Sequence, residues 1–179
     1  MATTKLWTAE ELEQLPDDEY RYALIKGELF RMPPPKFLHG RLVLAVGAPL
    51  FRFVEEHNLG IVSDQSGFIL GREPDTLLGP DLAFVQSARV PADENAYPML
   101  APDLVVEIVS PSQTGPSIEE KTALYLAAGV RLVWIVDAIR RGVRVRRADG
   151  TDRWLSEHDA LDGEDVLPGF RLPVSALFD

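Results

Sequence analysis

A strand–helix–strand pattern in the middle of the chain constrains the fold more than any other feature. The apolar segment Leu104–Val109 ends before Pro111, a helix expected from Ser117 runs to Gly129, and Leu132–Val136 is a second apolar run. Two buried strands joined by a helix form a crossover unit, in which both strands lie parallel in one sheet. The pattern therefore predicts a parallel pair at the centre of the fold.

Other signals predict antiparallel strands and further helices. A hairpin is expected because Tyr22–Ile25 and Glu28–Met32 flank Lys26-Gly27, a turn in which glycine can adopt positive φ. Single strands are expected at 60–71 and 80–85, and peripheral strands are expected at 142–147 and around position 154. One helix is expected after a capping box at position 8, and another over 39–58. Pro49 is expected to break or kink the last of these helices. We therefore expect an α/β protein in which the sheet is mixed, as in α+β folds, and is flanked by helices. A single domain is expected over residues 1–179.

Composition bounds the class of protein. With 46% hydrophobic and 26% charged residues, the 179-residue chain is typical of a globular protein. The longest uncharged run, Leu42–Phe51, is about half of the ~20 residues that a bilayer span requires, and the N-terminus lacks a signal-peptide pattern. We therefore expect a cytoplasmic protein with no membrane partner. Because cysteine is absent, Asp, Glu and His are the available side-chain metal ligands, and oxygen ligands favour Mg²⁺ or Mn²⁺.

The charge distribution bears on nucleic-acid binding. A net charge of −10 argues against a protein that coats nucleic acid non-specifically, because such binding depends on phosphate neutralisation. Six arginines nevertheless gather in one segment: Arg140, Arg141, Arg144, Arg146, Arg147 and Arg153. This Arg140–Arg153 segment is either a basic patch for DNA or the solvated face of a hairpin, and its alternation with valine favours the hairpin face.

Glu107 points most directly to a functional site. It lies within the apolar strand, and an ionised carboxylate in a core requires a counter-charge, a metal or hydrogen bonds. Asp103 shares its strand face but lies roughly 13 Å away at ~3.3 Å per residue, too far to share one ion, and is interpreted as a strand-entry residue. Asp81, after Pro80 at the head of the preceding strand, can lie beside Glu107 if the two strands are neighbours.

Lys121 is the second unusual charge. On a helix that begins near Ser117, it shares a sector with Tyr125 and apolar residues, where a core residue belongs. Because this helix leaves the Glu107 strand, the ammonium group can reach the carboxylates. A buried structural ion pair is the alternative for Glu107 and Lys121, and a turn carboxylate after proline is the alternative for Asp81.

These residues resemble a known nuclease motif. The PD-(D/E)XK motif is similar to three parts of this chain, namely Pro80-Asp81, Glu107-Ile108-Val109 and Lys121. The chain also looks like the Uma-two family of restriction-endonuclease-like bacterial proteins. This wider resemblance lies in Tyr22–Leu29, Pro102–Pro111, Lys121–Tyr125, Gly129 and Trp134. The resemblance covers nearly the whole chain. It implies a restriction-endonuclease-like core with a central mixed sheet that carries the acids, and Mg²⁺ as the metal.

The resemblance also implies roles for individual residues. Asp81 and Glu107 would bind the metal, with the Ile108 carbonyl as a third ligand, and Lys121 would orient a water or stabilise developing charge. Glu28 is a further catalytic candidate, because it shares a strand face with inward residues and the family has an acid there; a residue at a sheet edge is the alternative.

Two departures from the pattern are visible. The superfamily lysine lies two residues after the acid, where this chain has Val109, so Lys121 of the following helix takes that role. Family members often begin this helix with an acid, where this chain has Ser117.

The leading hypothesis is a Mg²⁺-dependent endonuclease that hydrolyses DNA phosphodiester bonds. The alternatives are a catalytically silent nucleic-acid-binding or assembly module that kept the fold, and a metal-dependent hydrolase of a small phosphoester. A homodimer or a higher homo-oligomer is expected, because nucleases often pair subunits to cut both strands and symmetric dimers are the commonest assemblies. The histidines show no ligand spacing, and we interpret His39, His57 and His158 as surface or helix-end residues.

Overall fold

A six-stranded mixed sheet forms the centre of the protein, whose computed structural model describes residues 5–16, 18–109 and 115–179. Its strands, in spatial order, are β10 (Asp152–Leu155), β9 (Gly142–Arg146), β8 (Leu132–Asp137), β7 (Leu104–Val109), β6 (Leu82–Gln86) and β3 (Gly60–Asp64). β7 and β8 are parallel, and the other neighbouring strands are antiparallel. The predicted crossover and mixed sheet are confirmed. Pro111, expected to end β7, lies outside the described residues.

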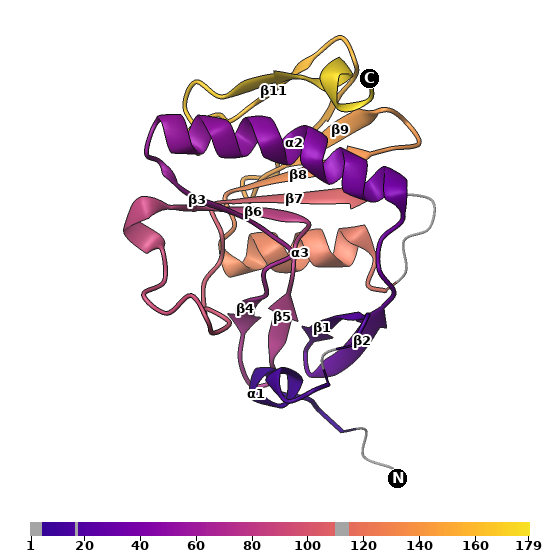
Figure 1. Cartoon of the computed structure of the whole chain (residues 1–179), viewed down its shortest axis with the longest axis vertical. Coiled ribbons are helices and arrows are strands. Elements are labelled where there is room, and N and C mark those ends of the chain that lie inside the picture. Colours follow the sequence, from indigo (N-terminus) through magenta and orange to yellow (C-terminus); the bar gives the residue numbers. More distant parts are fainter. Residues whose placement is uncertain (1–4, 17, 110–114) are drawn as a thin grey trace.

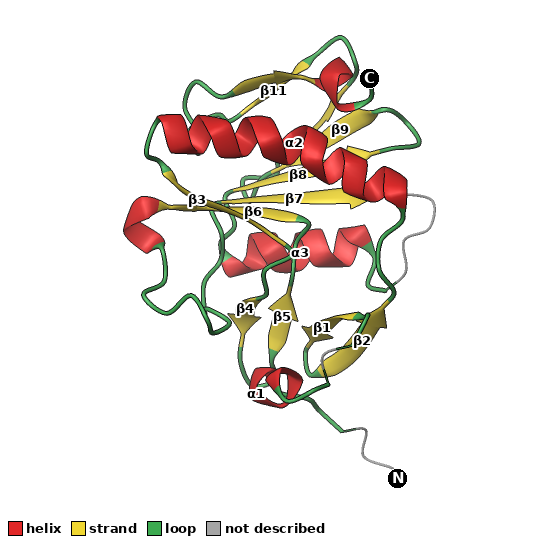
Figure 2. Ribbon diagram, viewed as in Figure 1, coloured by secondary structure: helices red, strands yellow, loops and turns green. Residues whose placement is uncertain are grey.

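Two helices cover opposite faces of this sheet (Figures 1 and 2). Helix α2 (Phe37–Glu56) lies on one face, and α3 (Ile118–Ala128), which connects β7 to β8, lies on the other. Side chains alternate along β7, so Val106 packs in the cluster under α2, whereas Val105 packs in the cluster that contains Tyr125 of α3. Glu107 follows the same alternation and therefore faces α3.

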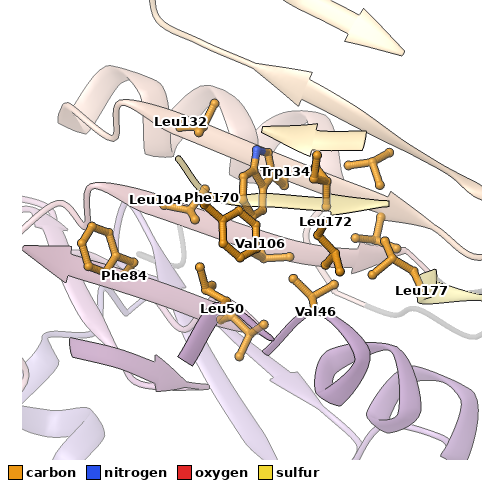
Figure 3. Close-up of a cluster of buried hydrophobic side chains, with 14 of the residues drawn as sticks. Val46, Leu50, Phe84, Leu104, Val106, Leu132, Trp134, Phe170, Leu172 and Leu177 are labelled. Carbon is orange, nitrogen blue, oxygen red and sulfur yellow. The ribbon is translucent and has the colours of Figure 1, made fainter. Parts of the chain in front are cut away.

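The core under α2 is mostly aliphatic and contains a stacked aromatic pair (Figure 3). Trp134 of β8 is fully buried and stacks on Phe170, with ring centroids 5.7 Å apart. Phe170 belongs to the C-terminal segment, which contains β11 (Ala160–Asp162), β12 (Arg171–Pro173) and the 3₁₀ helix η2 (Val174–Leu177). This segment closes the core beside α2.

A smaller sheet lies below the α3 face in Figure 1. Its spatial order is β2 (Glu28–Met32), β1 (Arg21–Ile25), β5 (Thr76–Leu78) and β4 (Phe68–Gly71). The predicted hairpin is confirmed as β1–β2, and Gly27 in its turn has φ of +79°. Helix α1 (Ala9–Glu13) packs beside this sheet, and the Thr8 side chain and Glu11 form the complete predicted capping box. A short 3₁₀ helix, η1 (Ser87–Arg89), follows β6.

Two expectations about the elements are wrong. The single strand expected over 60–71 is divided into β3 and β4, which belong to different sheets, and Gln65 between them adopts φ of +48°. Helix α2 runs through Pro49 without a break, although proline removes a backbone donor. The fully buried stripe that includes Val46, Leu50 and Val54 holds this helix on the sheet, and tertiary packing outweighs the local cost.

Helix α2 is long and apolar. Among the described residues it is the one helix long and apolar enough to match a membrane span, with mean hydropathy 1.4 over an 18-residue window. Its buried side chains pack against the central sheet (Figure 3), whereas Phe37, Leu44 and Phe51 are exposed.

Candidate functional site

Two buried acids lie side by side on the α3 side of the central sheet. The register of β6 and β7 aligns Leu82 with Val106, so one step further places Asp81 beside Glu107. Both side chains are buried, with residue exposures of 4% for Asp81 and 1% for Glu107. The strands predicted to bring these acids together are therefore neighbours.

Glu107 is held by two side chains of α3. Lys121 Nζ lies 2.5 Å from Glu107 Oε1, and the Tyr125 hydroxyl donates to the same oxygen at 2.7 Å. Because Lys121 and Tyr125 are four residues apart, they project from one face of the helix. Ser117 caps this helix by accepting from the Glu120 amide, and Gly129 ends it in a left-handed conformation. Tyr125 was placed in the inward sector by sequence, but its hydroxyl as a partner of Glu107 was missed.

Asp81 is held by three donors from three different elements. The Ile108 amide donates to Asp81 Oδ2 at 2.7 Å, His39 Nε2 lies 2.9 Å from Oδ1, and Arg21 Nη1 lies 3.5 Å from Oδ1. The Ile108 amide is free for this bond because β6 begins at Leu82, so no backbone carbonyl of β6 reaches it. In an extended strand the N–H and C=O of one residue point to the same side, so the Ile108 carbonyl points to the same edge of β7 as its amide.

His39 lies at a helix end, one of the two positions expected for it, but it is buried and not a surface residue. His39 lies in the first turn of α2, and its exposure is 6%. It begins the buried stripe that continues through Leu42 and Val46, at the i, i+3, i+7 spacing of an amphipathic helix. This spacing is the signal by which sequence could have found it. His57 at the end of α2 and His158 in a loop are exposed, as expected.

The environment shifts the pKa values of the site in opposite directions. Burial alone raises the pKa of Asp81, but the hydrogen bond and charge of His39, the Ile108 amide and the charge of Lys121 outweigh it and hold this pKa below its usual value. Burial raises the pKa of Glu107 despite the opposing charge of Lys121, and the neighbouring charge of Asp81 adds to the increase. Burial and Glu107 raise the pKa of Tyr125 well above its ordinary value. Two carboxyl groups with divided pKa values are a feature of catalytic sites.

The acids open into a cavity of about 500 Å³ between the two sheets. Asp81, Glu107, Lys121, His39 and Arg21 all line it. Its remaining walls come from the segment between α1 and β1, the proline run after β2, and residues near β4 and β5. The cavity gives a substrate access to otherwise buried charges.

Glu28 does not join this site. It is exposed and pairs with Ile25 beside the hairpin turn. The opposite end of the hairpin, where Arg21 pairs with Met32, lines the cavity, and four residues at ~3.3 Å each separate the two ends by roughly 13 Å. Glu28 is exposed at the turn end of β2, whereas Phe30 and Met32 on the same strand face pack against a core cluster.

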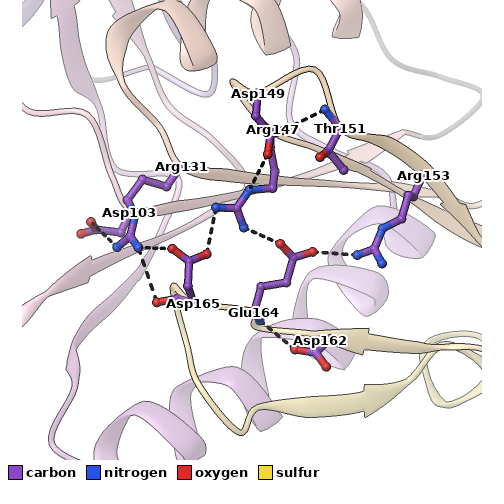
Figure 4. A network of polar contacts seen from close by, with 9 residues as sticks. All are labelled: Asp103, Arg131, Arg147, Asp149, Thr151, Arg153, Asp162, Glu164 and Asp165. Carbon is purple, nitrogen blue, oxygen red and sulfur yellow. Dashed lines mark hydrogen bonds and ion pairs between the residues drawn. The ribbon is translucent and has the colours of Figure 1, made fainter.

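Asp103 lies before the first residue of β7, and its carboxylate is bound by other side chains and an amide of the protein. Its carboxylate accepts from Arg89 Nη1 at 2.7 Å and from the Gln86 amide at 3.0 Å. It also lies 3.8 Å from Arg131, which joins it to the network in Figure 4. The interpretation of Asp103 as a strand-entry residue is confirmed.

The Arg140–Arg153 segment is balanced by acids. Arg147 pairs with Glu164 and Asp165, and Arg153 pairs with Glu164 (Figure 4). The remaining pairs are Arg140 with Asp137, Arg141 with Glu157, Arg147 with Asp149, and both Arg144 and Arg146 with Glu119 and Asp152. The segment is thus a hairpin face with neutralised charges, and a basic patch is not formed there.

Comparison with known families is decisive for the class of this protein. The chain matches, over residues 9–175, the model of the Uma2 family, which is described as "Putative restriction endonuclease". The chain belongs to the Uma2 family. This confirms the resemblance drawn from the sequence motifs and supports a nuclease, a hydrolase whose substrate is nucleic acid.

A solved structure has the same fold. It is described as "a putative nuclease belonging to DUF820" from Anabaena variabilis ATCC 29413, and it superposes with a TM-score of 0.83 at 22% sequence identity. The alignment covers 96% of this chain and 97% of that one. A search of curated proteins found no match. The restriction-endonuclease-like fold expected from sequence is therefore confirmed.

In this chain the lysine of the site does not lie on the strand that carries Glu107. Val109, two residues after Glu107, packs with the apolar cluster on the α3 side of the sheet. Lys121 reaches Glu107 from the following helix instead. The helix thus brings the lysine to the acid that the strand supplies.

Proposed function

We propose that this site hydrolyses DNA phosphodiester bonds with a divalent metal ion, Mg²⁺ or Mn²⁺. The observation that carries the proposal is the direct contact of buried Lys121 with buried Glu107, beside Asp81, at the floor of an open cavity. A cluster of charges in a cavity, with pKa values moved apart, is where acid–base or metal chemistry is expected.

The residues present suit a hard divalent cation. Within the described residues no three His, Asp or Glu side chains form a metal-binding group. Mg²⁺ nevertheless commonly binds through one or two carboxylates and keeps several waters and substrate oxygens. Asp81 and Glu107 would hold it, with the Ile108 carbonyl as the third protein ligand. Glu107 Oε2, which has no hydrogen-bond partner among the described residues, is available for this purpose.

A bound divalent ion would supply Lewis acidity to the phosphodiester. The protein side chains then have separate tasks. Lys121 would place a positive charge where negative charge develops on the phosphate, or would orient the attacking water. His39 and the Ile108 amide keep the Asp81 carboxylate ionised and fixed, and the Tyr125 hydroxyl fixes the position of the Glu107 carboxyl group. Glu28 has no task in this proposal.

The test is metal-dependent cleavage of plasmid and single-stranded DNA by the parent protein and by Lys121→Ala. Lys5→Ala is the matched control, because Lys5 is exposed, pairs with Glu11 and does not line the cavity. We expect cleavage with Mg²⁺ or Mn²⁺, its loss with EDTA, and a fall of at least 100-fold in Lys121→Ala alone, the order of effect of removing one transition-state contact. Equal cleavage by parent and Lys121→Ala, with contaminants excluded, would refute the role of Lys121.

Two rival functions are separated by the same assay. A silent binding or assembly module would bind DNA without cleavage, which would fit a structural role for the Glu107–Lys121 pair. A hydrolase of small phosphoesters would turn over a generic phosphodiester such as bis(p-nitrophenyl) phosphate without binding DNA at low salt. Light scattering of the purified protein tests the expected homodimer by its mass.

A further inference from the structure

We infer that the cavity takes an unpaired nucleic-acid strand, with one base against an aromatic and proline wall and its phosphate above the acids. This inference rests on the proposed function and names its substrate class. The first argument is size. A volume of about 500 Å³ lies within the ~300–1,000 Å³ range of small-ligand pockets, so it suits a single nucleotide and is far smaller than a double helix.

The second argument is the chemistry of the wall. Three tyrosines line the cavity, namely Tyr20, Tyr22 and Tyr97, and the run Pro33–Pro35 lies among them. Aromatic side chains are the platforms on which unpaired bases stack, and this contact tolerates every base. Paired bases inside a duplex do not expose their faces to such a wall.

The tyrosine rings are held in place by specific contacts. The Tyr22 hydroxyl donates to Asp18 at 2.8 Å. The Arg31 guanidinium lies over the Tyr20 ring, 3.4 Å from its centroid, and Tyr20 keeps 41% exposure. Tyr97 lies against Gly67, where an added Cβ would come within 2.8 Å of the ring. The wall is therefore preorganised, which lowers the entropic cost of binding.

The third argument concerns cations at the cavity. Arg21 Nε is buried and has no hydrogen-bond partner among the described residues, although this side chain lines the cavity. A phosphate oxygen would satisfy this donor, since guanidinium groups bind phosphate in a fork. Lys36, exposed at the start of α2, lines the same cavity and has no ion pair within the described residues. Two such cations suit one or two phosphates.

The fourth argument is the charge of the rest of the molecule. Duplex binding depends on neutralisation of many phosphates by basic residues, but the net charge is −10 and the arginines of the Arg140–Arg153 segment are paired with acids. Stacking in the cavity requires fewer cations. The surface thus favours a strand that enters the site over a duplex that lies across the protein.

The experiment compares a fluorescein-labelled 12-nucleotide DNA strand with a blunt duplex of the same sequence. Binding is measured by anisotropy in EDTA, where no cleavage occurs, and cleavage is measured with Mn²⁺. We expect at least tenfold tighter binding and faster cleavage of the single strand. Tyr20→Leu and Tyr97→Leu should each weaken single-strand binding by about fivefold to 100-fold, the loss of one stacked base. Phe51→Leu is the matched control, because Phe51 is 52% exposed on α2 and does not line the cavity.

The outcomes separate this inference from the proposed function. Duplex bound and cut as well as the single strand would overturn the inference and leave the phosphodiesterase proposal standing. Tight, tyrosine-dependent binding of the single strand without cleavage under any metal would support the inference and refute the proposed function. Equal binding by parent, Tyr20→Leu and Tyr97→Leu would remove the aromatic wall from recognition and overturn the inference.

Discussion

Removal of the Lys121 charge tests whether the buried pair is held together as the contacts indicate. In Lys121→Met the apolar stem is kept, but Glu107 retains a carboxylate with 1% exposure and loses its 2.5 Å cation. Breaking one side of a buried ion pair costs about 3–5 kcal/mol, because the remaining charge stays buried without compensation. The Tyr125 hydroxyl remains as a donor, so we expect a loss near the lower limit, about 3 kcal/mol in the free energy of unfolding at pH 7.

The pH dependence follows from the direction of the Glu107 shift. Burial already raises the pKa of Glu107 in the folded protein, and removal of Lys121 raises it further. A carboxyl group with a raised folded pKa binds its proton more tightly when folded, so its ionisation destabilises the fold as pH rises above the unfolded value. The deficit of Lys121→Met should therefore be largest near pH 8 and shrink toward pH 5, as Glu107 becomes neutral.

The measurement is urea denaturation of the parent protein and three variants between pH 5 and 8. In the double variant Lys121→Met, Glu107→Gln, no charge is left unpaired, so most of the lost stability should return. Lys5→Met is the control, and it should leave the stability nearly unchanged because the Lys5–Glu11 pair is exposed. A pH-independent loss in Lys121→Met, or a double variant less stable than the single one, would refute the reasoning.

Three further predictions concern the acid pair and the core. Asp81→Asn should lower the free energy of unfolding most at neutral pH, and this deficit should shrink below about pH 4. The reason is that the folded protein depresses the pKa of Asp81, and the stability from this shift is lost as the pH falls through the folded pKa. A deficit that grows on acidification in urea titrations would contradict this. Gly142→Ala should lower the free energy of unfolding by about 1–3 kcal/mol, since the added Cβ would lie 2.3 Å from the Trp154 ring. Gly71→Ala is the control and should stay within about 1 kcal/mol of the parent, because an added Cβ would have nothing within 4 Å. Equal midpoints of the two variants in thermal unfolding would contradict the prediction. Phe170→Ala should cost about 3–5 kcal/mol and change Trp134 fluorescence, because the stacked ring is lost; an unchanged spectrum would show that the rings are not in contact.

Local patterns in the chain were sufficient to predict the elements that carry the site. Apolar runs at 104–109 and 132–136, with a capped helix between them, predicted the parallel pair β7–β8, because the handed crossover follows from chain connectivity. The same two-residue alternation placed Glu107 on the face that α3 covers. The helical sector of Lys121 then predicted a contact that the structure has at 2.5 Å. These inferences succeeded because each depends on neighbours within one crossover unit.

Contacts between distant segments were decided by the tertiary structure alone. His39 and Arg21 reach Asp81 across 42 and 60 residues of sequence, and no periodicity of a single element encodes such meetings. Glu28 alternates with inward residues in the sequence, yet it faces solvent because it lies at the turn end of its strand, beyond the cluster that Phe30 and Met32 contact.

The difference has one physical reason. Periodicity, capping and turn chemistry act between residues close in sequence, so the sequence by itself determined the crossover, the hairpin and the side-chain faces of Glu107 and Lys121. The enclosure of the site, its second set of donors and the neutralisation of the arginines depend on how separate elements pack, since burial and ion pairing are properties of the assembled fold. Only the tertiary structure could therefore turn two buried acids and a lysine into a site that opens to a ligand.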